Sequence, residues 1–477
     1  MATITSLGLG SGLDSETIVT KLVALEKQPI SDLQAAASAL QTKLSTFGKI
    51  QSYLDSLKSA AGTLNSSITW RGSTASSSNT GAVQVTSSTG SSPGSYSVSV
   101  SQLATGQMTA SAALPSSTST PGAGTLNFDI GSWNADATAF TASGSTVSIA
   151  VEATDTLEAV RDKINAKDGL AVAASIVKDA SGARLVLQSK DTGVSHGFRV
   201  QVSDDDGNDG DAAGLSMLAY DPAGGAGVMT RTQAAQNAKG TINNLAVESE
   251  SNRLTDVIDG VSLSFGSVTA SPVSATVAND TDSMKGAVKD FVTAYNSLMG
   301  YLRDQTKYVE GSTSKNLQGD RTAIGLQQQV RSILSSSFGG VGSAFARASE
   351  IGLDVQKDGT IKLSDSKLTS ALSNIGELRK FFSADGDTTA EDGLTQRLTA
   401  MAQTWLDVDG GSLTARQGGL QKLIDINKSR QDAMQLRVDA MEKRLRAQYS
   451  ALDTSMSQLS SLQNYVTQQI TNWNKSS

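Results

Sequence analysis

The chain has 477 residues, a length that predicts about two to four domains. It contains no cysteine and a single histidine, which excludes disulfide frameworks, thiolate zinc sites and multi-histidine metal centres. Its net charge of −7 disfavours a nucleic-acid-binding protein, because such a protein needs a basic surface to neutralise phosphates. We therefore expect a protein that is not an enzyme and has no catalytic residues, cofactor or metal.

The first residues do not have the pattern of a secretory signal peptide, because they lack a basic segment followed by an apolar run. No segment approaches the ~18 consecutive apolar residues of a membrane span, so we expect no membrane insertion. Both observations leave the compartment open.

Residues from about Ser15 to Trp70 carry a helical pattern, in which apolar residues recur at alternating spacings of four and three. Asp14 or Ser15 can cap the helix start by accepting a backbone N–H. Pro29 predicts a break or kink near Gln28, because proline lacks the N–H that a helix interior requires. The stripe consists of Leu33, Ala37, Leu40, Leu44, Phe47, Gln51 and Leu54.

From about Arg71 to Asp280 the period changes to two, which predicts half-buried β-strands. One amphipathic helix interrupts them, with Leu157, Val160 and Ile164 on one face together with Arg161. The stretches 114–125 and 221–227 are rich in small and turn-forming residues, and we expect linkers or long loops there. The clearest strands are 82–86, 96–100, 146–151, 184–187, 198–202 and 261–265.

From about Ser283 the helical period returns, and its longest stripe runs from Met434 almost to the C-terminus. A helical arm therefore leads into the β-rich middle and a second arm leads back, so the two arms can pair antiparallel and bury their stripes. The apolar seam exceeds what one pairing covers, which predicts assembly into a larger object. The stripe comprises Met434, Val438, Met441, Leu445, Gln448, Leu452, Ser455, Leu459, Leu462, Val466, Gln469 and Trp473.

The predicted fold class is α+β multidomain, with N- and C-terminal helical arms that pair as a coiled coil or helical bundle and β-rich domains inserted between them. We expect coiled-coil or disordered arms at 1–42 and 436–477, and a helical bundle at 43–70 and 281–435. A β-rich domain is expected at 71–119 and 236–280, with an inserted β-rich domain at 120–235.

Three short motifs carry little chemistry. The run Gly8 to Gly12 is glycine-rich, but no strand precedes it and no Lys-Ser/Thr pair follows, so a phosphate loop is disfavoured. The acidic run 204–211 has part of a calcium-loop spacing, but Asp209 stands where glycine is required and Leu215 where glutamate should close the site. We expect a solvated turn there, with adventitious calcium binding as the alternative. His196 is expected to be a loop residue, and a catalytic triad is the weaker alternative.

Four segments resemble the flagellar filament-capping proteins, the hook-associated protein 2 or FliD family. The start Leu7-Gly8-Leu9-Gly10-Ser11-Gly12-Leu13-Asp14 is similar to that family's entry into its first helix, where Glu26 and Pro29 also match. The segments 251–263 and 352–382 are similar to its second half, and 159–193 resembles a small repeat shared by flagellins and hook-associated proteins. The four occur in the family's order and together cover essentially the whole chain.

The resemblance implies a structural cap at the tip of the bacterial flagellar filament. Such a protein forms a homo-oligomeric ring that promotes flagellin insertion and polymerisation and prevents subunit loss. The implied partners are further copies of the chain, flagellin, hook-associated junction proteins and an export chaperone that shields the C-terminal helix. The implied location is extracellular, after export by the flagellar type III system without a cleaved signal peptide.

The helical seams are the expected partner-binding surface, because transient packing against other helices requires unsatisfied apolar stripes. The residues expected to contact flagellin, chaperone or other copies are Leu9, Leu13, Ile18, Leu22, Leu452, Leu459, Leu462, Val466 and Trp473.

Two alternatives remain at this point. Another flagellar axial protein, such as a flagellin or a hook–filament junction protein, would share helical termini and exposed β-domains. A surface adhesin that binds host glycans through its Ser/Thr-rich β-domains is the second. The number of subunits in a ring, four, five or six, is not encoded in any motif.

Overall fold

The computed structural model describes residues 14–308, 310 and 317–475, which divide into two compact units. A helical unit combines the two ends of the chain, up to Trp70 and from Asp282, and a β unit spans Arg71–Thr281. None of the described helices is long and apolar enough to cross a membrane. The predicted fold class is confirmed. Along the sequence, the elements that form the antiparallel β-sheets lie between an N-terminal and a C-terminal helical arm.

The helical unit begins where a side chain caps a helix. Asp14 Oδ1 accepts the N–H of Thr17 at 3.0 Å and starts α1. The predicted break is confirmed, because α1 ends at Glu26 and α2 starts at Gln28 with Pro29 in its first turn, where its missing N–H costs nothing. The helices are α1 (Ser15–Glu26), α2 (Gln28–Asn65), α3 (Ser67–Trp70), α5 (Thr281–Thr306), α6 (Arg321–Ser335), α7 (Asp365–Ala371), α8 (Ile375–Ser383), α9 (Leu394–Leu406) and α10 (Ser412–Lys475).

The core of this unit lies around the second half of α2. From Phe47 onward the inward-facing residues of α2 are buried in one core with residues of α5, α6, α8, α9 and the start of α10. Trp70 stacks on Phe382 with ring centroids 5.6 Å apart, and its indole N–H donates to the carbonyl of Leu64 at 2.7 Å. A short hairpin of β19 (Leu353–Val355) and β20 (Ile361–Leu363) closes the core.

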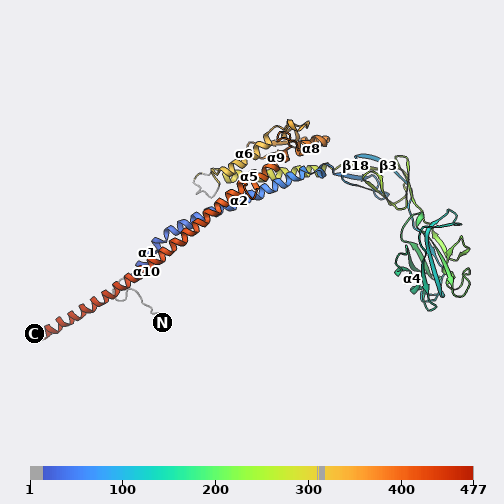
Figure 1. Ribbon diagram of the computed structural model, residues 1–477, viewed down its shortest axis with the longest axis horizontal. Helices are drawn as coiled ribbons and strands as arrows, with labels where there is room; N and C mark the ends of the chain where they lie inside the picture. Colours follow the sequence, from blue (N-terminus) through green and yellow to red (C-terminus); the bar gives the residue numbers. More distant parts are fainter. Residues whose placement is uncertain (1–13, 309, 311–316, 476–477) are drawn as a thin grey trace. The chain divides into compact units, whose positions relative to one another are not determined.

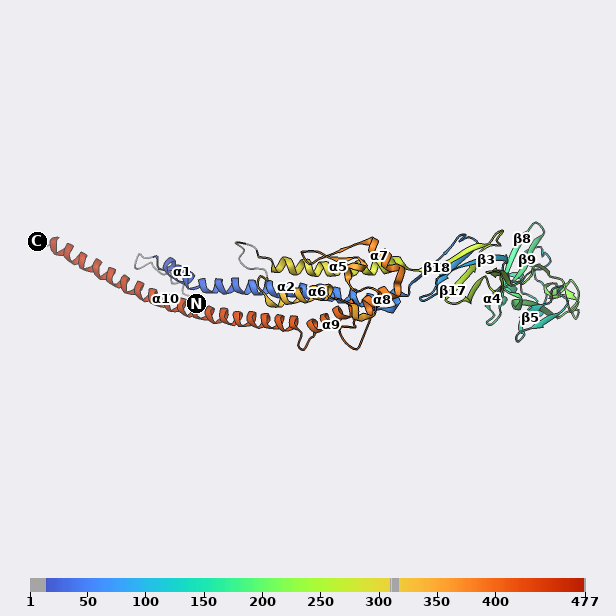
Figure 2. The same ribbon diagram turned by 90° about the horizontal axis from the view of Figure 1, so that it is seen from above.

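The arms pair antiparallel, as the stripes predict. Glu16 pairs with Arg446, and ten residues later Glu26 lies near Arg437, so residue numbers rise on one helix as they fall on the other. In Figures 1 and 2, α1 and α2 run side by side with α10. The buried residues between them are Val19, Val23, Ile30 and Val438, with Met434, Leu445 and Tyr449 packed at the edges.

The β unit contains two apolar cores. The first, here the β lobe, is built on a five-stranded antiparallel sheet in the order β1-β18-β3-β14-β15 and a three-stranded sheet in the order β16-β17-β2. Asn243 and Asn244, both with positive φ, form the tight turn between β14 and β15. The strands are β1 (Ser73–Ser77), β2 (Val83–Ser87), β3 (Gly94–Gln102), β14 (Ala238–Ile242), β15 (Leu245–Ser249), β16 (Arg253–Ile258), β17 (Val261–Phe265) and β18 (Val273–Asn279).

The second core belongs to the inserted lobe, in which α4 (Leu157–Ala166) lies against two sheets. One sheet has the order β12-β11-β10-β5-β6 with β7 also on β5, and the other has the order β13-β4-β9-β8. The strands are β4 (Met108–Ala110), β5 (Gly124–Trp133), β6 (Phe140–Ala142), β7 (Val147–Val151), β8 (Val172–Asp179), β9 (Gly182–Ser189), β10 (Gly197–Asp204), β11 (Tyr220–Asp221), β12 (Ala226–Gly227) and β13 (Thr230–Gln233).

All six predicted strands are confirmed as β2, β3, β7, β9, β10 and β17, although β2 and β7 begin one residue later than predicted, and the predicted helix is α4. The segment 221–227, predicted to be a linker or loop, is instead the hairpin of β11 and β12, which extends a sheet. The proposed division into four structural parts, at 1–42 with 436–477, 43–70 with 281–435, 71–119 with 236–280, and 120–235, stays a prediction.

Candidate assembly surface on the helical arms

The predicted contact residues at the start of the chain fall into two groups. Leu9 and Leu13 lie outside the described residues. Ile18 is 37% exposed and Leu22 is half-buried. The residues that follow them, Val19 and Val23, are buried against α10. Both pairs are spaced by four on neighbouring stripes of α1, so helical periodicity alone could not decide which pair faces the partner helix. Val19 and Val23 are therefore contact residues that the sequence analysis missed.

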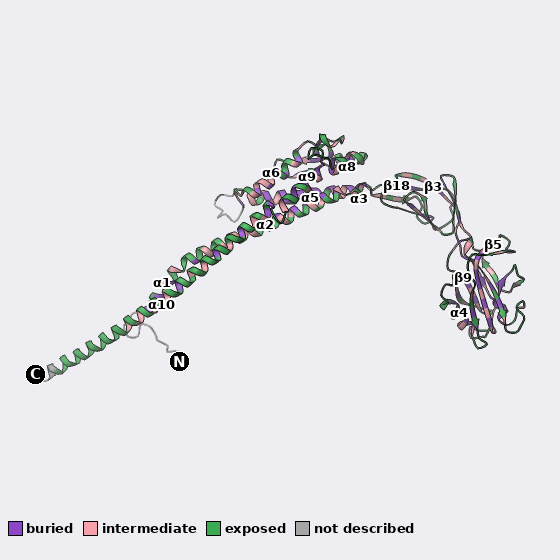
Figure 3. Cartoon of the chain, in the orientation of Figure 1, coloured by how far each residue is buried: buried purple, intermediate pink, exposed green. Residues whose placement is uncertain are grey.

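The predicted residues near the C-terminus are on a different surface. After Ala451, α10 continues without a neighbour that buries its apolar face, and Figure 3 shows this end of the helix almost entirely exposed. Six apolar side chains there, 39–59% exposed, share about 120° of the helix circumference at 100° per residue. We call them the distal seam: Leu452, Met456, Leu459, Leu462, Val466 and Ile470. Trp473 lies in the same helix.

A polar clamp holds the two arms in register. Both Glu16 carboxylate oxygens accept hydrogen bonds of 2.8 Å from Arg446, and Arg446 Nε donates to Glu442 at 2.9 Å. Hydrogen bonding from Arg446 lowers the pKa of Glu16, and the hydrogen bonds to Glu16 and Glu442 raise the pKa of Arg446. The groups are solvent-exposed, so the clamp contributes more to alignment than to stability.

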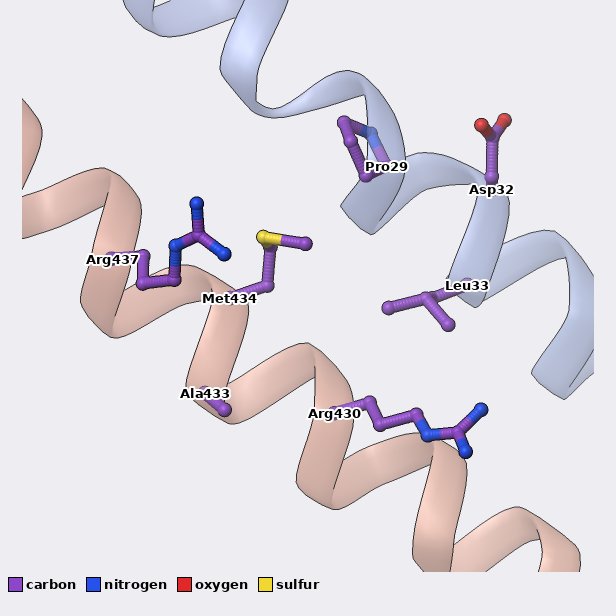
Figure 4. Close-up of a pocket in the computed structure, with 7 residues that line it drawn as sticks. All are labelled: Pro29, Asp32, Leu33, Arg430, Ala433, Met434 and Arg437. Atoms are coloured by element: carbon purple, nitrogen blue, oxygen red, sulfur yellow. The ribbon is translucent and has the colours of Figure 1, made fainter.

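A groove opens beside the helix break between α1 and α2. Its volume is about 550 Å³, and we call it the arm groove (Figure 4). Leu33 and Met434 extend into it from the two helices, while Arg430 and Arg437 border it on the α10 side. An apolar floor bordered by two arginines and by Asp32 suits a side chain from an additional helix. The lining residues are Pro29, Asp32, Leu33, Arg430, Ala433, Met434 and Arg437.

In the described ranges no three metal-ligating side chains gather to hold an ion. In the acidic run 204–211, carboxylates satisfy the turn itself: Asp204 accepts from Ser216, and Asp209 accepts the N–H of Asp204 at 2.7 Å. The carboxylates of Asp204 and Asp209 therefore accept hydrogen bonds from N–H and hydroxyl groups of the loop itself.

His196 lies near a serine and a glutamate, the residue types of a catalytic triad. Their spatial order does not suit nucleophilic catalysis. Ser195 Oγ donates to Glu250 Oε1 at 2.6 Å and lies 3.2 Å from His196 Nδ1. A catalytic triad requires the histidine to take the serine proton, with the carboxylate on its far side. Here the serine lies between the other two groups, and its hydroxyl donates its hydrogen bond to the carboxylate instead of to the histidine.

Family profiles and curated relatives match this chain along most of its length. The N-terminal family profile of flagellar hook-associated protein 2 matches residues 11–107, its C-terminal profile matches 235–461, and the flagellin hook IN motif matches 138–191. The flagellar hook-associated protein 2 of Escherichia coli K12 is 31% identical, and the alignment covers 99% of both chains. The B-type protein of Pseudomonas aeruginosa is 31% identical over 97% of this chain and 96% of its own.

A solved structure extends the likeness to the fold. The D1–D2–D3 domains of the flagellar cap protein FliD from Escherichia coli superpose with a TM-score of 0.59 at 28% identity. The match covers 79% of this chain and 99% of the solved chain. The chain belongs to the flagellar hook-associated protein 2 family, the FliD family of filament caps.

Proposed function

We propose that this protein caps the flagellar filament through its paired arms, and that the distal seam of α10 is the surface that contacts neighbouring subunits. The family and its cap structures support the role of a structural cap at the filament tip, outside the cell. They do not favour a different axial protein or a glycan-binding adhesin. The protein acts by packing and carries no proposed catalytic step.

The observation that carries the proposal is the distal seam itself. An amphipathic helix in water is stable when its apolar stripe is covered, and large exposed apolar patches mark interaction surfaces. The six residues of the distal seam share one face, so they can pack together against one partner helix. Ile18 and Leu22, exposed and half-buried beside the arm pair, extend the proposed contact surface toward α1.

The arm groove provides a second proposed contact near the break between α1 and α2. A two-helix pair covers only one side of each stripe, and a third helix would fill the groove above Leu33 and Met434. The arms would then contact other chains at two levels, at the groove and beyond Ala451.

Several partners follow as proposals. Copies of this chain would form the ring, and flagellin would pack against the arms as each subunit is inserted. Hook-associated junction proteins would lie beneath the first cap. An export chaperone would cover the distal seam before secretion by the flagellar type III route, because the same apolar residues promote aggregation in the free protein.

The direct test compares two variants of α10 that have the same length and the same added charge. One carries the charges on the distal seam and the other carries them on the opposite face. Leu459→Glu with Val466→Glu places two charges on the seam, whereas Ser461→Glu with Gln468→Glu places two charges seven residues apart on the opposite face. We expect the seam variant to release flagellin into the medium and to shorten filaments, and the control to support normal filaments. Equal filament length in both strains would overturn the assignment of the seam.

A deletion of residues 453–477 gives a coarser comparison. It removes most of the distal seam and should abolish capping, while the β unit retains its circular dichroism spectrum and its unfolding transition. Normal filaments from the truncated chain would contradict the proposal. Negative-stain images of the purified protein would distinguish closed rings, expected for a cap, from long filaments, expected for a flagellin.

A further inference from the structure

The inserted lobe is joined to the β lobe by two short chain segments, which we call the neck: residues 103–107 and 234–237. They pair through Thr105 and Gln236, whose N–H groups donate to each other's carbonyls at 2.9 and 3.1 Å. Thr105 Oγ1 also donates to the carbonyl of Ala234 at 2.9 Å. Two paired segments resist stretching, but they bend and twist more easily than a packed apolar core.

A third contact crosses the same junction. The turn at residues 192–196, here the brace turn, leaves the inserted lobe between β9 and β10 and meets the end of β15. The hydroxyl of Thr192 donates to the carbonyl of Glu250 at 2.7 Å, and the N–H of Val194 donates to Asn237 Oδ1 at 2.8 Å. Asn237 is itself held by Glu248, whose Oε1 accepts from Asn237 Nδ2 at 2.9 Å.

The side chains of the brace turn form an ordered chain of hydrogen bonds. The Ser195 hydroxyl gives its hydrogen to Glu250 Oε1, so only a lone pair of Ser195 Oγ remains for His196. His196 Nδ1 lies 3.2 Å from Ser195 Oγ and 3.8 Å from Glu250 Oε2, so the imidazole lies beside both groups of this contact. The chain's only histidine thus supports the serine that contacts the other lobe.

Gly193 allows this close approach. Its φ of 104° is one that L-residues with side chains avoid, and a Cβ at this position would lie 2.6 Å from the Cβ of Glu250 and 2.8 Å from its carbonyl oxygen. Any other residue would therefore push the brace turn away from Glu250.

We propose that residues 192–196 form a releasable brace that sets the orientation of the inserted lobe on its neck. The brace contacts are hydrogen bonds between partly exposed groups, which water can replace, whereas the two lobes on either side have separate buried apolar cores. Release therefore changes the angle between the lobes without unfolding either one. This device is independent of the surface on the helical arms.

The test measures the distance between the lobes in the full-length protein. Because the natural chain has no cysteine, Thr74→Cys in β1 and Lys178→Cys in β8 provide two unique sites for spin labels. Both residues are exposed, one in each lobe. Pulsed electron paramagnetic resonance, with labelled chain diluted in unlabelled chain, then reports the distribution of distances within one molecule.

The brace is broken in two ways. Gly193→Ala introduces the clash with Glu250, and Ser195→Ala with Glu250→Ala removes the hydrogen-bonded side chains. Gly169→Ala is the matched control, because Gly169 also has a positive φ of 76° but faces open space. Near-UV circular dichroism establishes that both lobes remain folded, and the double variant keeps the test decisive if Gly193→Ala unfolds.

We expect a single narrow distance distribution for the parent and for Gly169→Ala, and a clearly broader or shifted one for both brace variants. Hydrogen exchange at the Val194 amide should accelerate roughly tenfold or more once its surroundings open, while amides within β9 and β10 exchange as before. A brace variant that is folded and keeps the parental distance distribution would overturn the proposal.

Discussion

Glu16 and Arg446 meet through two hydrogen bonds of 2.8 Å, although 430 positions separate them in sequence. This contact sets the register of α1 on α10. We expect Arg446→Gln to raise the pKa of Glu16 back toward its ordinary value of 4.5, because the first cause of the lowered pKa is the hydrogen bond from Arg446.

The sign of the pH dependence follows from the same shift. A carboxyl group with a lowered folded pKa stabilises the fold at pH above its unfolded value of 4.5. That contribution disappears as the pH falls through the lower folded value. Carbon-detected NMR titration of Glu16 in both proteins measures it, and an unchanged midpoint in Arg446→Gln would show that the clamp is not formed in solution.

The buried stripe of α1 should be distinguishable from the exposed one by mutation. Val19→Ala removes apolar volume that is fully buried against α10, and we expect it to destabilise the arm pair by about 1–3 kcal/mol. Ile18→Ala, on the neighbouring and more exposed stripe, should cost under about 0.5 kcal/mol. Hydrogen exchange of α1 amides reports both values, and equal effects would contradict the observed facing of α1.

An ion pair in the inserted lobe should be sensitive to loss of one partner. Arg199 donates to Asp129 Oδ2 from Nε at 3.1 Å and from Nη2 at 2.8 Å, and the Thr146 hydroxyl donates to Oδ1 at 2.6 Å. Asp129 is buried, so Arg199→Met should leave an uncompensated carboxylate and destabilise the lobe by about 3–5 kcal/mol. Adding Asp129→Asn should recover much of the loss in urea unfolding. No recovery in the double variant would mean that the effect comes from lost packing or from Asp221, a second buried carboxylate 3.8 Å from Arg199 Nη1.

Alkaline pH should weaken the helical core through Tyr295. Burial raises the pKa of its hydroxyl, which donates to the carbonyl of Gly359 at 3.1 Å. A raised folded pKa means that the neutral phenol is favoured in the fold, so stability is complete below the ordinary value of 10 and falls as the pH rises beyond it. Tyr295→Phe should lose part of this dependence. The free energy of unfolding in urea between pH 8 and 11 gives the slopes, and identical slopes would exclude Tyr295 as the cause.

Local patterns in the sequence were sufficient for the helical arms, for six of the strands and for the family resemblance. The period of two predicted six strands, because alternate residues of a half-buried strand face opposite environments. Pro29 predicted the break between α1 and α2 from its missing N–H, and the four matched segments identified the family before any contact was known. The hairpin at 221–227 was missed, because glycine-rich turns and glycine-rich linkers have the same composition.

The sequence by itself determined the helical arms, the β-rich middle and the apolar seam near the C-terminus, since each depends on the spacing of residues close together in the chain. Only the tertiary structure decided that Val19 and Val23, rather than Ile18 and Leu22, are buried on α10, because adjacent stripes of one helix are equally apolar until a partner covers one. It also decided that Ser195 contacts Glu250. That contact joins two separately packed lobes, and the geometry of the neck, not any local pattern, brings it together.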